Sequence, residues 1–297
     1  MQLLRRIVVE NQYSGNGWNF EKTTKYIFEQ DQMQLEAGYF EHYLDDVFIK
    51  AVVELPISYG CPVHCKFCAT SFIESFRRLE PEQMKELLDY IWAEQRLGER
   101  EYVLLSVTGT GDIYFNFSNV KKFLEGLIVY DNLFVTLSSC LWERKTLRVI
   151  EDLSEKIRIR NVQVTCISDD QNILERIIPI YSQKKSNFNE VLEYIKTSAK
   201  KYYRFNYVMI YGVNDSYEDF QRFRDKIDQI KDKIVVRIAK LNKTGATERN
   251  NLYPAEIEKM EQFKELLLSS NIKGYLFYAC KNDYMNCGQL ISEKAAQ

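Results

Sequence analysis

The chain has 297 residues, of which 45% are hydrophobic and 28% are charged, a composition typical of a soluble globular protein rather than a disordered or fibrous one. The 40 basic and 42 acidic side chains leave a formal charge of −2, which disfavours a protein held to nucleic acid mainly by bulk positive charge. No apolar run is long enough to span a membrane, and none follows the N-terminal basic pair as in a signal peptide, so we expect no membrane contact.

The first 60 residues are rich in β-forming sequence. We predict strands at residues 23–28 and 34–40, joined by a turn at 29–32, and a third apolar run at 47–57. Pro81 then opens a helix whose apolar residues recur at helical spacing on one face. These segments predict a small β-rich extension over residues 1–50 that leads into a different kind of fold.

From residue 102 onwards, strand-like runs alternate with helical patterns. The strand-like runs are residues 102–107, 133–137, 162–166, 205–210, 235–239 and 275–278. The helical patterns between them are residues 120–127, 141–153, 189–198, 217–230 and 255–269. This alternation predicts an α/β fold with a parallel sheet and right-handed crossovers. About six such units are too few for a closed eight-fold barrel, so we predict a partial (β/α)6 barrel over residues 51–297.

In such a fold, ligands bind at the carboxyl ends of the strands. The polar, turn-rich segment 240–251 is predicted to be a long loop over that end.

Three of the seven cysteines lie in the segment Cys61-Pro62-Val63-His64-Cys65-Lys66-Phe67-Cys68. An odd number of cysteines, crowded in this way, does not fit a disulfide framework, so we expect a reducing, cytoplasmic setting and a role in metal binding or chemistry. A structural zinc site needs four protein ligands, and His64, between two cysteines, is badly placed to be the fourth. A [4Fe–4S] cluster held by three cysteines instead leaves one iron open to a small ligand. Zinc or a purely structural cluster remains the alternative.

This spacing, with the aromatic Phe67 before the last cysteine, resembles the radical S-adenosylmethionine (radical SAM) superfamily. The resemblance implies that Cys61, Cys65 and Cys68 hold the cluster and that its open iron binds SAM. It also implies that an electron from a reductant such as flavodoxin or ferredoxin cleaves SAM to a 5′-deoxyadenosyl radical. Phe67 would pack against the bound ligand.

A second motif, Gly109-Thr110-Gly111-Asp112, directly follows a strand-like run. It could be an ordinary turn between a strand and a helix, because glycine tolerates tight backbone. It also lies one βα unit after the cysteines, at the strand end where a cofactor is expected. There the bare backbone can approach SAM, and Asp112 can accept hydrogen bonds from the SAM ammonium group.

From about residue 25 to residue 290 the chain resembles the RlmN/Cfr family of radical SAM enzymes, which methylate an adenine of ribosomal RNA. Four motifs occur in the family's order: the cysteine loop at 60–70, the glycine motif at 109–112, the stretch at 207–216 and Cys287-Gly288-Gln289-Leu290. In the glycine motif, Asp112 and Ile113 replace the family's usual Glu-Pro.

The resemblance implies roles for single residues. Ser138 and Thr165 take the places of SAM-contacting serines, and Asn242 that of a SAM-binding asparagine. Cys287 matches the cysteine that first accepts a methyl group from SAM. Glu36 lies in a segment that resembles the one holding the family's proton acceptor. The other three cysteines, Cys140, Cys166 and Cys280, are expected to be packing residues.

Two departures set this chain apart from the family. Glu54 stands seven positions before the cluster, where the methylases carry a second cysteine that forms a disulfide with the methyl-carrying one. A carboxylate cannot undergo thiol–disulfide exchange. The chain also starts near the family's catalytic core, without the N-terminal RNA-binding domain. We therefore favour a radical reaction at a carbon centre of a small molecule, nucleotide or peptide.

Two alternatives stay open. The first is RNA adenine methylation as in the family, for which Cys166 or Cys280 would have to approach Cys287 as a new resolving thiol. We expect neither to lie within disulfide range. The second is a metal-stabilised module that binds RNA without catalysis, which would hold a metal but would not cleave SAM.

Overall fold

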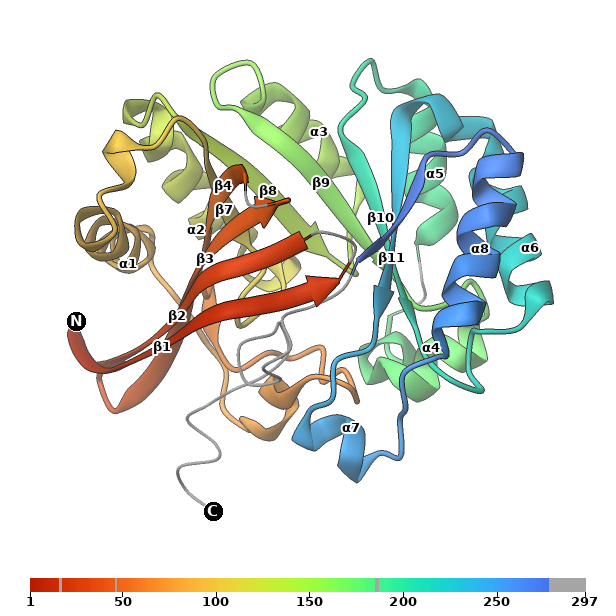
Figure 1. Ribbon diagram of the computed structural model, residues 1–297, viewed down its shortest axis with the longest axis horizontal. Helices are drawn as coiled ribbons and strands as arrows, with labels where there is room; N and C mark the ends of the chain where they lie inside the picture. The colour runs from red at the N-terminus through yellow and green to blue at the C-terminus, as the bar shows by residue number, and fades with distance from the viewer. Residues whose placement is uncertain (16–17, 46, 185–186, 278–297) are drawn as a thin grey trace.

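The computed structural model describes residues 1–15, 18–45, 47–184 and 187–277, which are built around a sheet of ten strands (Figure 1). In the order in which they pair, the strands are β1 (Gln2–Gly15), β2 (Trp18–Gln30), β3 (Met33–Leu44), β4 (Val47–Glu54), β7 (Val103–Val107), β8 (Leu133–Ser139), β9 (Ile159–Cys166), β10 (Tyr203–Met209), β11 (Ile234–Lys240) and β12 (Gly274–Phe277). A separate pair, β5 (Ser58–Tyr59) and β6 (Arg77–Arg78), brackets the cysteine loop in sequence.

The strands β1 to β4 pair antiparallel. The turn between β2 and β3 has positive φ angles of 50° at Asp31 and 63° at Gln32, as a tight two-residue hairpin turn requires. The predicted strands at 23–28 and 34–40 fall inside β2 and β3. The strand β1 was not predicted, because it lies at the edge of the sheet and buries too few side chains to leave a clear apolar pattern.

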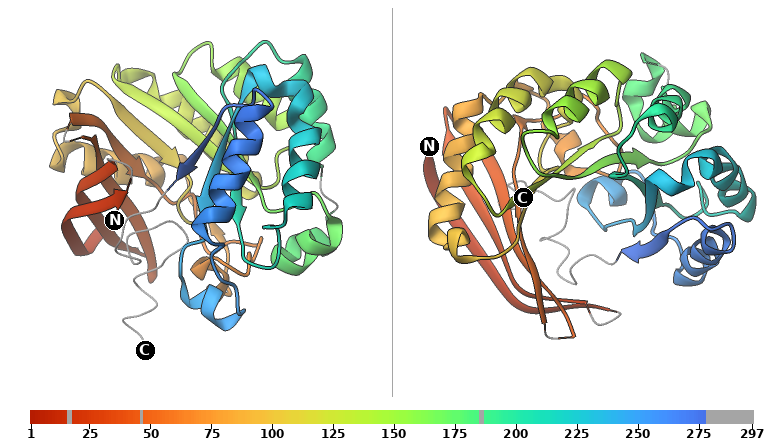
Figure 2. Two further views of the ribbon diagram at one scale, coloured as in Figure 1. Left: turned by 45° about the vertical axis from the view of Figure 1, so that its right-hand side comes forward. Right: turned by 90° about the horizontal axis from the view of Figure 1, so that it is seen from above.

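From β4 to β12 every neighbouring pair of strands is parallel. The connecting helices cover the outer face of the curved sheet, which leaves its concave face open (Figure 2). The helices are α1 (Pro81–Glu94), α2 (Ile113–Glu125), α3 (Arg144–Leu153), α4 (Gln171–Ile177), α5 (Phe188–Thr197), α6 (Tyr217–Ile227), α7 (Gly245–Arg249) and α8 (Ile257–Ser269). The predicted α/β fold with a partial barrel is confirmed, and β1 to β3 continue its sheet at one edge.

Several helix boundaries differ from the prediction. The helix α2 begins at Ile113 rather than at residue 120, because Asp112 caps it by accepting a hydrogen bond from the Tyr114 backbone N–H at 2.9 Å. The helix α3 begins at Arg144 rather than at residue 141. The helices α4 and α7 were missed because seven and five residues are too few to display a helical period.

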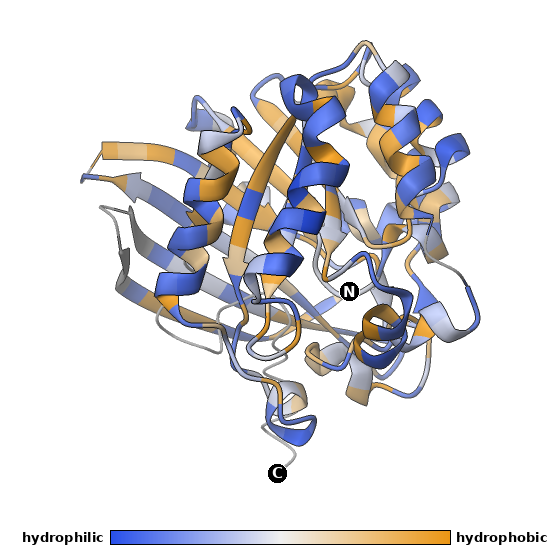
Figure 3. Cartoon of the chain, turned by 90° about the vertical axis from the view of Figure 1, so that its right-hand side faces the viewer, coloured by the Kyte–Doolittle hydropathy of each residue, from blue (hydrophilic) through white to orange (hydrophobic). Residues whose placement is uncertain are grey.

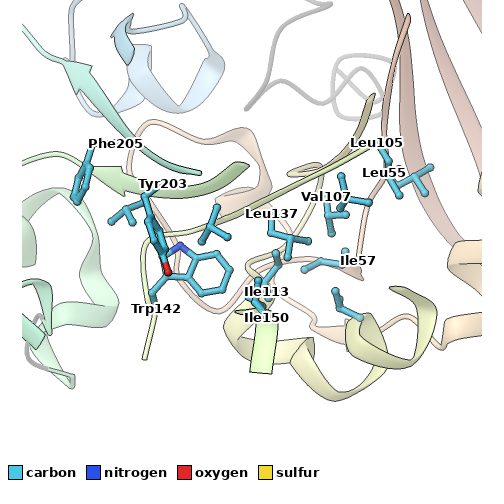
Figure 4. Close-up of a cluster of buried hydrophobic side chains, with 14 of the residues drawn as sticks. Leu55, Ile57, Leu105, Val107, Ile113, Leu137, Trp142, Ile150, Tyr203 and Phe205 are labelled. Atoms are coloured by element: carbon cyan, nitrogen blue, oxygen red, sulfur yellow. The ribbon is translucent and has the colours of Figure 1, made fainter. Parts of the chain in front are cut away.

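The main core lies between the sheet and the helices (Figure 4). Side chains such as Leu105, Leu137 and Phe205 point outward from their strands and are fully buried there. The indole N–H of Trp142 donates to the Gln163 carbonyl at 2.7 Å, which satisfies the one polar atom of this buried ring. Hydrophilic and hydrophobic bands alternate along the helices in Figure 3, as expected of helices with one buried face.

Within the described part of the chain, none of the helices combines the length and the apolar character that a bilayer crossing requires.

Candidate cofactor and active site

A cavity of about 990 Å³ opens on the concave face of the sheet. Every predicted site residue that the structure describes lines it: Glu36, Cys61, Cys65, Phe67, Cys68, Gly109, Thr110, Gly111, Asp112, Ser138, Thr165 and Asn242. The structure thus brings together residues from six separate segments of the chain. Cys287 and Cys280 lie outside the described residues. That neither Cys166 nor Cys280 lies within disulfide range of Cys287 therefore stays a prediction.

The cysteine loop follows β5, and its three cysteines are free thiols that are partly buried. Burial raises the pKa of the Cys61 thiol well above its ordinary value, and the nearby Asp112, Cys65 and Cys68 raise it further. These four groups therefore lie within electrostatic reach of one another. The exposed His64, with a φ of 52°, is separate from this group.

The segment over the cysteine loop is not the plain loop predicted at 240–251, since it contains the short helix α7. Residues at both ends of α7 bind the backbone of the cysteine loop. The Thr244 hydroxyl donates to the Phe67 carbonyl at 3.0 Å, and the Asn250 amide donates to the Lys66 carbonyl at 2.9 Å. The cysteine loop is therefore fixed from the opposite side of the barrel.

The donor set fits an iron–sulfur cluster. Within the described ranges, no three His, Cys, Asp or Glu side chains converge on a point that could hold a single metal ion. A cubane cluster binds one thiolate at each of three irons, so its cysteines lie further apart than the ligands of one ion. Three free thiols on one loop beside an open cavity match that requirement better than they match structural zinc.

The glycine motif packs against the segment that leads from β4 to the cysteines. The Gly109 N–H donates to the Leu55 carbonyl at 3.1 Å, and a Cβ on Gly109 would lie 2.6 Å from that oxygen. Gly111 has a φ of +108°, and a Cβ there would lie 2.2 Å from the Ser58 hydroxyl. No side chain fits at either position, so the two motifs are held in contact through bare backbone.

Asp112 is buried, with 8% of its surface exposed. Besides capping α2, it accepts hydrogen bonds from the Ser139 hydroxyl at 2.6 Å and the Cys140 N–H at 3.0 Å. Burial raises the pKa of Asp112, while these donors act in the opposite direction. Asp112 thus fixes the end of β8 in place as well as lining the cavity.

Hydrogen bonds link three neighbouring strands below Asp112. The Ser138 hydroxyl lies 3.4 Å from the Thr165 hydroxyl and accepts a hydrogen bond from the Gln163 amide at 2.9 Å. Gln163 in turn accepts from Arg204 at 2.9 Å. Sequence reasoning missed Gln163, although a buried amide in a strand that otherwise alternates is a usable signal.

Comparison with known proteins identifies the family. Residues 55–227, more than half of the chain, match the Radical SAM superfamily. The chain belongs to this superfamily. Members use a [4Fe–4S] cluster and SAM, so the predicted cofactors and enzyme class are confirmed.

Relatives that align over most of the chain point the same way. A protein named probable dual-specificity RNA methyltransferase RlmN, from Pseudothermotoga lettingae, is 26% identical over 92% of this chain and 76% of its own length. A protein of the same name from Aquifex aeolicus is 27% identical over 85% of this chain and 74% of its own. The solved structure of a radical SAM methyltransferase from Sphaerobacter thermophilus superposes with a TM-score of 0.77 over 98% of this chain and 81% of its own, at 18% identity. The last comparison establishes likeness of fold.

Cys140 packs against a core cluster, as predicted, and it also lines the cavity. Its thiol lies near Cys65 and donates a hydrogen bond to the Asp112 carboxylate at 3.4 Å. The interaction with Cys65, burial and Asp112 raise the pKa of Cys140 well above its ordinary value. Cys166, by contrast, is a buried packing residue whose thiol lies 3.7 Å from the Val164 carbonyl.

Glu36 and Glu54 line the cavity from adjacent strands and are 5% and 8% exposed. Gly38 pairs with Glu54, which makes Glu36 its diagonal neighbour on the same face of the sheet. The Thr108 hydroxyl donates to Glu54 at 3.5 Å. The position predicted to correspond to the second cysteine of the RlmN/Cfr methylases is thus part of the cavity wall, and it presents a carboxylate.

Proposed function

We propose that Cys61, Cys65 and Cys68 hold the [4Fe–4S] cluster, and that SAM binds in the cavity beside them. The assignment rests on the fact that residues far apart in the sequence meet at one place. Residues chosen from motifs spread between positions 36 and 242 line one cavity. Except for Glu36 in the antiparallel strand β3, they lie at or after the carboxyl ends of parallel strands, where this class of fold binds ligands.

The protein's own groups divide the work of binding SAM. Phe67 supplies an aromatic face, and Gly109 to Gly111 supply backbone that can approach a ligand closely. Asp112 lines the site and holds the end of β8, so that Ser138 is in position. Thr165 and Asn242 add polar groups from β9 and from the segment after β11. When bound and reduced, the cluster supplies the electron that cleaves SAM to a 5′-deoxyadenosyl radical.

The substrate side of the proposal is a reaction at a carbon centre of a small molecule, nucleotide or peptide. RNA adenine methylation is the second candidate, because the relatives from Pseudothermotoga lettingae and Aquifex aeolicus are named as RNA methyltransferases. The cavity position of Glu54 favours the first candidate. A carboxylate there cannot release a methylated product by disulfide formation with Cys287.

Anaerobic reconstitution with iron and sulfide, followed by SAM and a reductant such as flavodoxin or ferredoxin, tests the cofactor assignment. We expect about four irons per chain and formation of 5′-deoxyadenosine. Bound metal without SAM cleavage would instead identify a non-catalytic binding module.

Incubation with labelled SAM separates the two substrate candidates. One arm contains ribosomal RNA and the other a cell extract depleted of RNA. We expect label or a new product in the second arm only. Release of 2- or 8-methyladenosine over many turnovers, with Cys287→Ala inactive, would establish RNA methylation and overturn our preference.

A further inference from the structure

Seven lysines and arginines line the cavity, and four of them lie near one another: Lys50, Arg160, Arg204 and Arg237. We call this set the basic end. Arg160 and Arg204 are the second residues of β9 and β10. Lys50 and Arg237 are the fourth residues of β4 and β11. The basic end therefore extends from the amino ends of β9 and β10 to the middle of β4 and β11. Arg160 is roughly 16 Å from Thr165 when measured along β9.

The three arginines act on Lys50. The pKa of Lys50 is lowered to about 8, first by burial and then by the nearby Arg204, Arg237 and Arg160. Burial, followed by the charge of Lys50, also lowers the pKa of His42 well below its ordinary value, which keeps that ring neutral. All three arginines are thus close enough to Lys50 to disfavour its charged form.

Uncharged side chains orient Arg204 and Arg237. The Nε of Arg204 donates to Gln163 at 2.9 Å, and the Nε of Arg237 donates to Asn206 at 2.6 Å. Both amides are buried, so each guanidinium is held in one direction. Arg160 hydrogen-bonds with the Tyr102 hydroxyl. None of these partners carries a charge.

Carboxylates are absent from the basic end in the part of the chain that the structure describes. No salt bridge there involves Lys50, Arg160 or Arg204. The acidic residues that line the same cavity, Glu36, Glu54 and Asp112, lie toward the cysteines. Glu54 is four residues along β4 from Lys50, roughly 13 Å.

We propose that the basic end binds a phosphate group of the substrate. A phosphate carries about two negative charges and three strong acceptor oxygens, which match several fixed arginine forks better than a singly charged carboxylate does. The inference rests on the proposed function in one respect, namely that the same cavity receives the substrate. It then specifies a phosphorylated molecule whose reacting carbon, beside SAM, lies on the order of 10–15 Å from the phosphate.

Calorimetric titration with inorganic pyrophosphate, in phosphate- and sulfate-free buffer, tests the site without any assumption about the rest of the substrate. We expect pyrophosphate to bind the wild type, and Lys50→Met and Arg204→Gln to weaken it ten- to hundredfold, because each removes charge-assisted hydrogen bonds. The matched control is Arg148→Gln, at an exposed position of α3 outside this cavity, which should bind like the wild type. Equal affinity in wild type, Lys50→Met and Arg204→Gln would overturn the proposal.

A second measurement does not depend on how the variants fold. Adenosine 5′-monophosphate should bind the wild type at least tenfold more tightly than adenosine. Equal binding of the two would contradict the phosphate site. Replacing the nucleotide with a short single-stranded RNA distinguishes a free phosphorylated molecule from a polymer as the source of the phosphate, and both sources agree with the site.

These titrations require neither the cluster nor SAM cleavage, so they fail independently of the proposed function. Normal 5′-deoxyadenosine formation without pyrophosphate binding would remove the phosphate site alone. Pyrophosphate binding without SAM cleavage would remove the proposed function and leave an anion site.

Discussion

The cofactor end of the cavity is built from loops, whereas the basic end is built from single strand residues. At the cofactor end, contiguous motifs follow the strands and hold one another through backbone contacts, such as Gly109 with Leu55. At the basic end, each cation comes from a different strand, and buried side-chain amides orient Arg204 and Arg237. A cofactor site of this kind tolerates little change, because its backbone is fixed. The basic end can change one side chain at a time while the sheet is preserved.

The largest effect is expected from breaking the cofactor end at Cys65. Cys65→Ala should lose most of its iron and all 5′-deoxyadenosine formation, since two cysteines cannot retain the cluster. Iron per chain after anaerobic reconstitution is the measurement. The control is Cys166→Ala, which removes a thiol from the packed core and should keep its iron. Full iron content in Cys65→Ala would rule out the ligand assignment.

Asp112→Asn tests how the cofactor end is held. This change removes a charge and leaves at least one donor, from Ser139 or Cys140, without its acceptor. We expect SAM to bind ten- to hundredfold more weakly and the free energy of unfolding to fall by about 1–3 kcal/mol, while iron content is kept.

Asp170→Asn is the matched control for Asp112→Asn. Asp170 caps α4 by accepting from the Asn172 N–H at 2.8 Å, but it is exposed, and asparagine is an equally good cap. It should change stability by less than about 0.5 kcal/mol. Unchanged SAM affinity in Asp112→Asn would remove Asp112 from the binding site.

The same contrast explains what could be predicted from the sequence. The cofactor end was accessible, because the cysteines and the glycine motif are contiguous and their spacing carries the chemistry. The basic end was not, because Lys50 and Arg237 are 187 positions apart (237 − 50) and become neighbours only when the sheet forms. Cys140 was correctly predicted to pack, but its place in the cavity near Cys65 was not predicted, because it depends on the tertiary structure. In the fold, the long periodic helices were predictable, whereas the edge strand β1 and the short α4 and α7 were not.

At the basic end, Lys50 should make the free energy of unfolding rise with pH. Its pKa is about 8 in the folded chain and about 10.5 when unperturbed. Between these values the unfolded chain binds more protons at this group than the folded chain does, so stability from Lys50 rises with pH across that window. The wild type should gain on the order of 1–3 kcal/mol relative to Lys50→Met between pH 8 and pH 10.5.

Denaturant unfolding of both proteins at several pH values checks this dependence, with the exposed Lys145→Met as control. Saturating pyrophosphate should reduce the difference, because a bound anion favours the charged lysine. A wild-type and Lys50→Met difference that stays constant with pH would show that Lys50 is not perturbed.

The smallest effect is expected from a change at Cys140. This change tests whether a fourth thiol also holds the cluster. The Cys140 thiol lies near Cys65 in the same cavity, so its position alone would allow it to be a ligand. A fourth cysteine ligand would, however, occupy the iron that SAM needs, and three cysteines are sufficient to hold a cluster. We therefore expect Cys140→Ala to keep its iron and its SAM cleavage, and to lose less than about 1 kcal/mol of stability, because the side chain is only partly buried. Iron content, 5′-deoxyadenosine yield and unfolding free energy should be measured together. A loss of iron as large as that in Cys65→Ala would make Cys140 a ligand and require SAM to bind elsewhere in the cavity.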